Sequence, residues 1–141
     1  MHRLFTKWVV AALLPVVLLG IGEMRSGGAL AEPDLTALAR ARIEAAHRAY
    51  QEALDLYREG RSRDVDRIYL WSVRWLEAER DAAARPADQL PAWEAHTKRM
   101  KQLDDLVRGR FRAGVAAAVE LPAVEYYRKE ADFWLARARR P

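Results

Sequence analysis

Residues 35–60 read LTALARARIEAAHRAYQEALDLYREG, and this stretch decides the fold class. Its apolar or small residues recur at steps of three and four, which places them along one stripe of an α-helix. They are Leu35, Ala39, Ile43, Ala46, Tyr50, Ala53 and Tyr57. Asp34 is a typical N-cap residue and Gly60 a typical helix stop. The pattern predicts an amphipathic helix over residues 34–59.

Three further stretches have the same rhythm. They predict helices over residues 64–85, 88–113 and 119–139. No stretch alternates with period two over the length of a strand, so no β-sheet is expected. Because the connections are short, we expect consecutive helices to be antiparallel neighbours. The predicted fold class is therefore all-α, with four long helices in an up-down-up-down antiparallel bundle or in two stacked helical hairpins.

The beginning of the chain has the layout of an export signal. A basic leader precedes the apolar residues 8–21 (WVVAALLPVVLLGI), and small residues follow at Ala29 and Ala31. At about 1.5 Å per residue the apolar stretch is about 21 Å long, shorter than the hydrocarbon core of about 30 Å. We expect residues 1–31 to be a cleaved signal peptide, with an uncleaved N-terminal anchor as the alternative.

Residues 32–141 are then expected to form one helical domain that is periplasmic or exported. With an uncleaved anchor, this domain would be attached to the inner membrane and face the periplasm, and it would touch a membrane only through the N-terminal segment. The formal net charge is +4, and half of this excess lies in the first 31 residues. Since little positive charge remains, no nucleic-acid partner is expected.

Several kinds of chemistry lack the residues they need. The chain has no cysteine, which rules out disulfides, thiolate metal sites and thiol nucleophiles. Glu44 and His47 form one Glu-x-x-His pair, but a di-iron bundle needs two such pairs, and Lys98 and Lys101 stand in the corresponding part of the third helix. No metal or cofactor is expected.

The sequence also contains no recognisable set of catalytic residues. The serines after residue 31 are Ser62 and Ser72, and neither His47 nor His96 is expected to lie beside a serine nucleophile. The glycines of this part are isolated, so no phosphate-binding loop is formed. We therefore expect a protein without catalytic residues that is not an enzyme.

The two halves of the chain are similar when they are aligned with a shift of 54 residues. Residues 57–60 (YREG) then match residues 111–114 (FRAG), and Asp66 matches Glu120. An aromatic residue lies in the last helical turn, glycine provides a left-handed cap, and an acid favours the start of the next helix. This predicts two hairpin repeats, over about 34–85 and 88–139, neither of which can bury its apolar stripe alone.

These landmarks resemble the TolC-type outer-membrane efflux proteins. The periplasmic hairpins of that family carry an aromatic residue, two further residues, a glycine, about five small or apolar residues, an acid, and then Val or Leu. The second copy here follows this pattern, and the first has an arginine at the last position. The family's protomers are several times longer and include barrel strands, so the resemblance concerns the hairpins only. It implies interaction turns that meet a partner protein at Gly60, Asp66, Gly114 and Glu120.

The aromatic residues suggest a second surface. Trp71 and Trp75 are one helical turn apart, and Tyr126 and Phe133 add bulk to the last helix. They either thicken the core or form an aromatic contact face for another helix or a second subunit.

The function expected from the sequence is that of an exported, non-enzymatic helical-hairpin protein of the cell envelope. It would serve as a protein-interaction or scaffold module, with a partner protein or self-association. The alternative is a periplasmic helical chaperone or a stress or metal sensor. An efflux component is a third reading, which requires another protein to supply the barrel.

Overall fold

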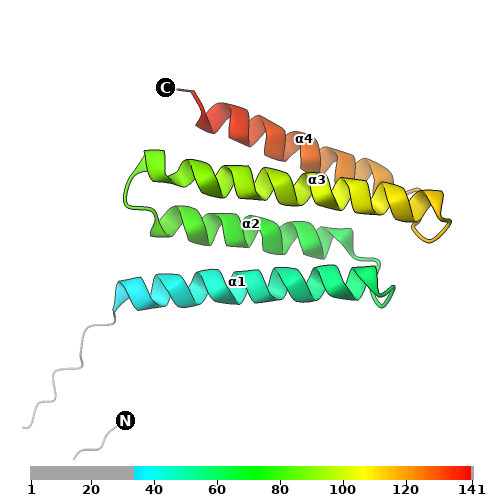
Figure 1. Ribbon diagram of the computed structural model, residues 1–141, viewed down its shortest axis with the longest axis horizontal. Coiled ribbons are helices and arrows are strands. Elements are labelled where there is room, and N and C mark those ends of the chain that lie inside the picture. The colour runs from blue at the N-terminus through cyan, green and yellow to red at the C-terminus, as the bar shows by residue number, and fades with distance from the viewer. Residues whose placement is uncertain (1–33, 141) are drawn as a thin grey trace, which may run out of the picture. The chain divides into compact units, whose positions relative to one another are not determined.

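The computed structural model describes residues 34–140, and the regular structure of this range is entirely helical (Figure 1). The elements are α1 (Leu35–Arg58), α2 (Val65–Ala82), the 3₁₀ turn η1 (Pro86–Gln89), α3 (Leu90–Arg112) and α4 (Glu120–Ala138). The all-α prediction is confirmed for these residues, none of which lies in a strand. The predicted signal peptide, residues 1–31, lies outside the described residues.

Side-chain caps fix where the first two helices begin. Asp34 Oδ1 accepts hydrogen bonds from the backbone N–H groups of Thr36, at 2.9 Å, and Ala37, at 3.2 Å. Asp64 Oδ1 accepts from the N–H of Arg67 at 3.0 Å. The first N–H groups of a helix have no partner inside it, so both aspartates stabilise a helix at the residue where it starts.

The connection between α2 and α3 differs from the prediction. We expected the second helix to continue to residue 85, but α2 ends at Ala82. Arg85 is extended, with φ −136° and ψ 152°, because a proline disfavours the helical conformation of the residue before it. Pro86 opens η1, and Pro91 lies in the first turn of α3, where its missing N–H has no helical partner.

The helices pack most extensively in two pairs, α1 with α2 and α3 with α4, and α2 also contacts both α3 and α4 (Figure 1). Arg42 in the early part of α1 pairs with Asp81 at the end of α2, with 2.6 Å between Nη1 and Oδ2. Arg139, directly after α4, pairs with Glu94 in the early part of α3 at 2.8 Å. Each of these contacts joins the start of one helix to the end of the next.

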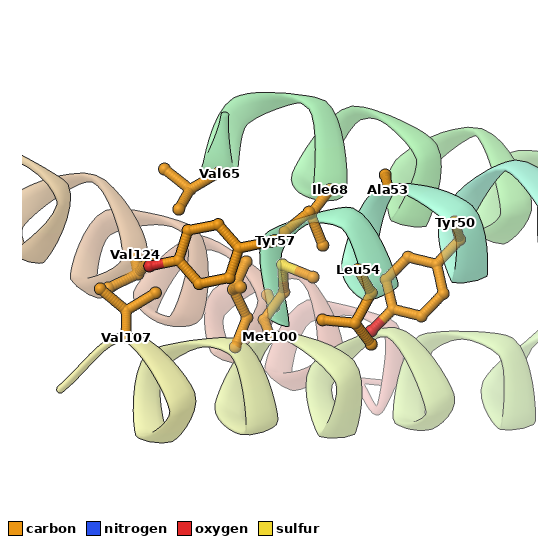
Figure 2. Packing of buried hydrophobic residues seen from close by; sticks show 11 residues of the cluster. Tyr50, Ala53, Leu54, Tyr57, Val65, Ile68, Met100, Val107 and Val124 are labelled. Atoms are coloured by element: carbon orange, nitrogen blue, oxygen red, sulfur yellow. The ribbon is translucent and has the colours of Figure 1, made fainter. Parts of the chain in front are cut away.

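One apolar core draws on all four helices, as Figure 2 shows from close by. Its buried members are Tyr50, Ala53, Leu54, Tyr57, Val65, Ile68, Met100, Leu103, Val107, Val124 and Ala131. The ring of Tyr57 lies among valines from α2, α3 and α4 (Figure 2). Burying such side chains removes apolar surface from water, which is the main favourable contribution to folding.

The first turns of α1 extend past this core. Leu35 is 75% exposed, although it belongs to the apolar face predicted for this helix, and Leu38 is 54% exposed. The reason is length, because α1 has 24 residues and its neighbour α2 has 18. At about 1.5 Å per residue, roughly 9 Å of α1 has no counterpart on α2.

Candidate functional site

The connections α1–α2 and α3–α4 lie together at one end of the bundle (Figure 1). We refer to these connections and the helix ends next to them, residues 58–67 and 110–120, as the turn end. Each turn contains a glycine with positive φ, Gly60 at 73° and Gly114 at 72°. Residues with a side chain rarely adopt this left-handed conformation, so glycine is the residue that these turns require.

The two turns share one backbone hydrogen-bond pattern. In each, the glycine N–H donates to the carbonyl three residues back, and the following N–H donates to the carbonyl five residues back, which is a Schellman cap. The distances are 3.0 Å for Gly60 to Tyr57, 2.9 Å for Arg61 to Leu56, 2.9 Å for Gly114 to Phe111 and 2.8 Å for Val115 to Arg110. The two landmarks taken from the sequence therefore have the same local geometry.

Arg110 connects the turns. Its Nη1 donates to the backbone carbonyl of Arg58 at 2.9 Å, and its guanidinium lies 5.0 Å from the centre of the Tyr57 ring. A Cβ added at Gly60 would lie 3.7 Å from Arg110 Nη2, which is ordinary contact. The end of α3 is thus fixed to the end of α1 by a charge-assisted hydrogen bond and a cation–π contact.

Glu120 lies inside this end of the bundle and not on its surface. It is 6% exposed, its Oε2 accepts from the Tyr57 hydroxyl at 2.5 Å, and its Oε1 accepts from the N–H of Ala117 at 2.9 Å. Burial, and then the hydrogen bond to this carboxylate, raise the pKa of Tyr57, so its hydroxyl remains a donor. Of the predicted interaction residues, Glu120 therefore supports the turns from within.

Asp66 is the exposed counterpart of Glu120 in the first turn of α2. Its Oδ1 accepts from the hydroxyl of Tyr127 on α4 at 2.5 Å. Tyr69 on α2 likewise donates to Glu130 on α4. Burial raises the pKa of Tyr127 and Tyr69, and the hydrogen-bonded acids raise it further. These bonds join α4 to α2 beside the turn end.

Apolar side chains on the α3–α4 side of the turn end face solvent. Phe111 is 41% exposed, Val115 is 48% exposed and Val119 is 77% exposed. The same end carries exposed arginines that form no ion pair within residues 34–140, namely Arg63, Arg67 and Arg112. The turn end therefore combines exposed apolar groups with arginines that lack an ion pair in the described residues, whereas its acids Glu59, Asp64 and Asp66 have partners within the chain.

The four aromatic residues predicted to form a contact face do not share one surface. Trp71 and Trp75 are partly buried against the core, and the Trp75 ring lies 4.4 Å from the ring of His47 on α1. Tyr126 and Phe133 are exposed on α4, whose backbone makes no close contact with that of α1. The tryptophans thus serve the α1–α2 interface, and only the two α4 residues remain open to a partner.

A buried polar network joins α2 and α3 in the middle of the bundle. Ser72 Oγ lies 2.9 Å from His96 Nδ1, and Arg99 Nε donates to Ser72 Oγ at 2.8 Å. Arg99 Nη2 also donates to the Ser72 carbonyl at 3.2 Å, and the guanidinium lies 4.1 Å from the Trp75 ring centre. Ser72 and His96 have no exposed surface, and Arg99 is 6% exposed.

Burial determines the charges of this network. It lowers the pKa of His96 to about 3, with the positive charge of Arg99 as the next cause, so the imidazole is neutral at pH 7. Burial also lowers the pKa of Arg99 and raises that of Glu79, while each of these two charges favours the ionised form of the other. Arg99 therefore has a nearby acid, without a direct ion pair to it in the described residues.

The contact between Ser72 and His96 was not predicted from the sequence. The available signal was spacing, since positions 96 and 99 lie on the three-four stripe of α3 and such positions face the core. A serine nucleophile needs a base oriented by an acid and a path for substrate. Here the third group is the donor Arg99, and both Ser72 and His96 are fully enclosed. This geometry is that of a hydrogen-bonded core.

The Glu-x-x-His pair takes part in other contacts. Glu44 Oε2 lies 3.9 Å from Arg48 Nη1, and His47 Nε2 lies 3.3 Å from Gln51 Nε2. Across residues 34–140, no group of three or more acids and histidines is placed to hold a metal ion. None of the helices described here combines the length and apolar content needed to cross a bilayer.

Comparisons with protein-family models, with curated proteins and with solved structures find no match to this chain. The resemblance of its turns to TolC-type hairpins therefore stays a prediction from the sequence.

Proposed function

We propose that this chain is an exported protein-interaction module of the cell envelope and that the turn end is its contact surface. The observation that carries the proposal is the exposure of Phe111, Val115 and Val119 at the outermost part of the bundle. Exposed apolar groups that lie close together are typical of contact sites, because a partner can remove them from water. Their place on a hairpin turn agrees with the role that the resemblance implies.

The turn end is also rigid before it meets a partner. Two Schellman caps, the Arg110 contact with Arg58 and the buried Tyr57–Glu120 hydrogen bond fix its backbone. A surface that is already ordered loses little conformational entropy on binding, so more of the interaction energy appears as affinity. The inward position of Glu120 supports the proposal, since it holds the apolar turn in place.

Charge favours a different protein over a second copy of this chain. Arg63, Arg67 and Arg112 lie at the same end as the apolar residues and have no ion-pair partners in the described part of the chain. A second copy would bring the same arginines, and the acids of its turn end, Glu59, Asp64 and Asp66, already have partners within the chain. The partner that fits is a protein with an apolar patch bordered by carboxylates.

The proposal is tested by in-cell cross-linking of the full-length chain. One variant combines Val115→Asp with Val119→Asp, and a second combines Arg63→Glu with Arg112→Glu. All four side chains are exposed, so the fold is expected to persist, which far-UV circular dichroism checks. The matched control is Leu35→Asp with Leu38→Asp, which changes exposed leucines at the opposite end of the bundle.

We expect one cross-linked partner in the wild type and the control that is lost in both turn-end variants. With the isolated partner, binding should weaken as salt rises, because arginines contribute to it. Equal cross-linking by all the variants would refute the contact surface, and so would sedimentation that shows self-association alone. N-terminal sequencing of the exported protein tests cleavage after Ala31.

A further inference from the structure

A hollow of about 410 Å³ lies at the end of the bundle opposite the turn end, between the end of α2, the start of α3 and the end of α4. Its lining consists of Arg80, Trp93, Trp134, Arg137 and Ala138. The two indole rings meet edge to face, with centroids 5.9 Å apart and planes at 64°. The Arg80 guanidinium lies 4.4 Å from the centre of the Trp93 ring. Aromatic walls and cationic groups therefore meet at one place.

Three of the acids that flank this hollow in the sequence are paired elsewhere. Asp81, Asp88 and Glu94 form ion pairs at 2.6 to 2.8 Å with other arginines, namely Arg42, Arg85 and Arg139. Within residues 34–140 neither Arg80 nor Arg137 has an ion pair, and the contact of Arg80 with Gln89 Oε1 uses only its Nε. The remaining N–H groups of two guanidiniums are thus available to an anion.

The wall of the hollow is fixed from behind. The Trp134 ring stacks on His96, with centroids 5.8 Å apart and planes at 26°, and His96 belongs to the buried polar network. The Arg80 guanidinium is held between the Trp93 face and Gln89. Such a site exists before a ligand arrives, which is usual for small-molecule sites.

Other hollows of the described bundle differ in that acids contribute to their lining. The one beside α1 contains the same type of pair, with the Arg74 guanidinium 4.8 Å from the Trp71 ring centre, but Glu77 also lines it. Three further hollows are also lined by acids. The first has Glu94 and Asp132, the second has Asp81, and the third has Asp64, Asp66 and Glu120. An acid in the lining repels an anionic ligand, and the hollow at Trp93 and Trp134 has none.

We propose that this hollow binds a small aromatic carboxylate. The ring would lie against the indoles of Trp93 and Trp134, where flat apolar groups gain both burial and aromatic contact. The carboxylate would accept charge-assisted hydrogen bonds from Arg80 and Arg137, whose planar guanidiniums match its two oxygens. A volume of about 410 Å³ is within the range of ligand sites. This binding role is separate from the contact at the turn end and does not depend on it.

The test titrates the full-length protein with phenylacetate and with phenylacetamide, which keeps the ring and removes the charge. Isothermal titration calorimetry gives the affinity, and NMR shifts of the indole N–H groups locate the site. The variants are Arg137→Gln, which removes one exposed guanidinium, and Ala138→Glu, which adds an acid to the exposed rim. The matched control is Arg74→Gln, which removes the arginine of the other indole pair.

We expect saturable binding of phenylacetate that shifts the Trp93 and Trp134 signals. Phenylacetamide, Arg137→Gln and Ala138→Glu should each weaken binding by about tenfold or more, since a hydrogen bond to a charged group is lost or opposed. Arg74→Gln should leave the affinity unchanged. The proposal is overturned if the amide binds as well as the acid, if Arg74→Gln weakens binding as much as Arg137→Gln, or if phenylacetate does not saturate.

Discussion

Replacing Tyr57 with phenylalanine removes one oxygen atom from the base of the turn end and leaves the Glu120 carboxylate inside the core. Both side chains are buried, at 1% and 6% exposure, and of the donors in residues 34–140 Glu120 would keep the N–H of Ala117 alone. Losing a hydrogen bond to a buried charged group costs about 1.5–3 kcal/mol. Because one donor remains and the ring still fills its space, we expect Tyr57→Phe to lower the free energy of unfolding by about 2 kcal/mol.

The matched control is Tyr126→Phe, which removes the same atom and also breaks a bond to a glutamate. Tyr126 is 60% exposed and donates to Glu130 Oε1 at 2.8 Å, so water can replace it and we expect less than about 0.5 kcal/mol. Urea denaturation followed by far-UV circular dichroism gives both values. With a slope of about 2 kcal/mol per molar, Tyr57→Phe should lower the midpoint by about 1 M.

A double-mutant cycle of Tyr57→Phe with Glu120→Gln separates this hydrogen bond from other effects. Residues that share a buried hydrogen bond are expected to show a coupling energy of about 0.5–3 kcal/mol. If Tyr57→Phe destabilises the protein no more than Tyr126→Phe, or if the coupling is zero, the turn end is not held by this bond. A contact surface preformed by the buried Tyr57–Glu120 pair would then be refuted.

Two further predictions concern the turns and the core. Gly114→Ala should destabilise the protein by at least about 1 kcal/mol because φ is 72°, whereas Gly109→Ala inside α3 should stabilise it by about 0.5–1 kcal/mol; thermal melts that rank them in the reverse order would contradict the left-handed cap. The folded-state pKa of His96, about 3, lies below the ordinary 6.5, so the unfolded chain binds the extra proton and stability falls with acid between these values. Between pH 6.5 and 5 the loss of folding free energy should approach about 1.4 kcal/mol per pH unit. This loss should be smaller in His96→Gln and should persist in His47→Gln, and Glu79 is present in all three proteins. Equal pH slopes in chemical denaturation would disprove the prediction.

The helices could be predicted because local features decide them. The three-four stripe of α1, the cap at Asp34 and the stops at Gly60 and Gly114 all depend on residues within a few positions of one another. The predicted end of α2, residue 85, lies beyond the observed end at Ala82. A proline restricts the conformation of the residue before it, but it does not determine how many earlier residues also leave the helix. In the structure Ala83 is already extended, with ψ 130°.

The polar interior could not be predicted in the same way. An arginine such as Arg99 on a helix usually faces water, and its burial depends on Ser72, which lies 27 residues earlier on another helix. The motif that contains Glu120 suggests an acid that caps a helix at the surface. What places it inside is the hydroxyl of Tyr57, 63 residues away. Both outcomes depend on how the helices meet, and a stripe of apolar residues does not specify that.

These buried polar groups explain how one arrangement of the helices is selected. If α3 slipped by one turn along α2, about 5.4 Å, apolar side chains would still meet apolar side chains, because both stripes repeat at nearly that interval. The slip would break the bonds between Arg99 and Ser72 and leave both enclosed, at about 1–3 kcal/mol for each unpaired group. The Tyr57–Glu120 bond constrains α1 and α4 in the same way. The apolar stripes therefore determine that the chain is a helical bundle, whereas the buried polar residues set the register that brings the turns together at one end and Trp93 and Trp134 together at the other.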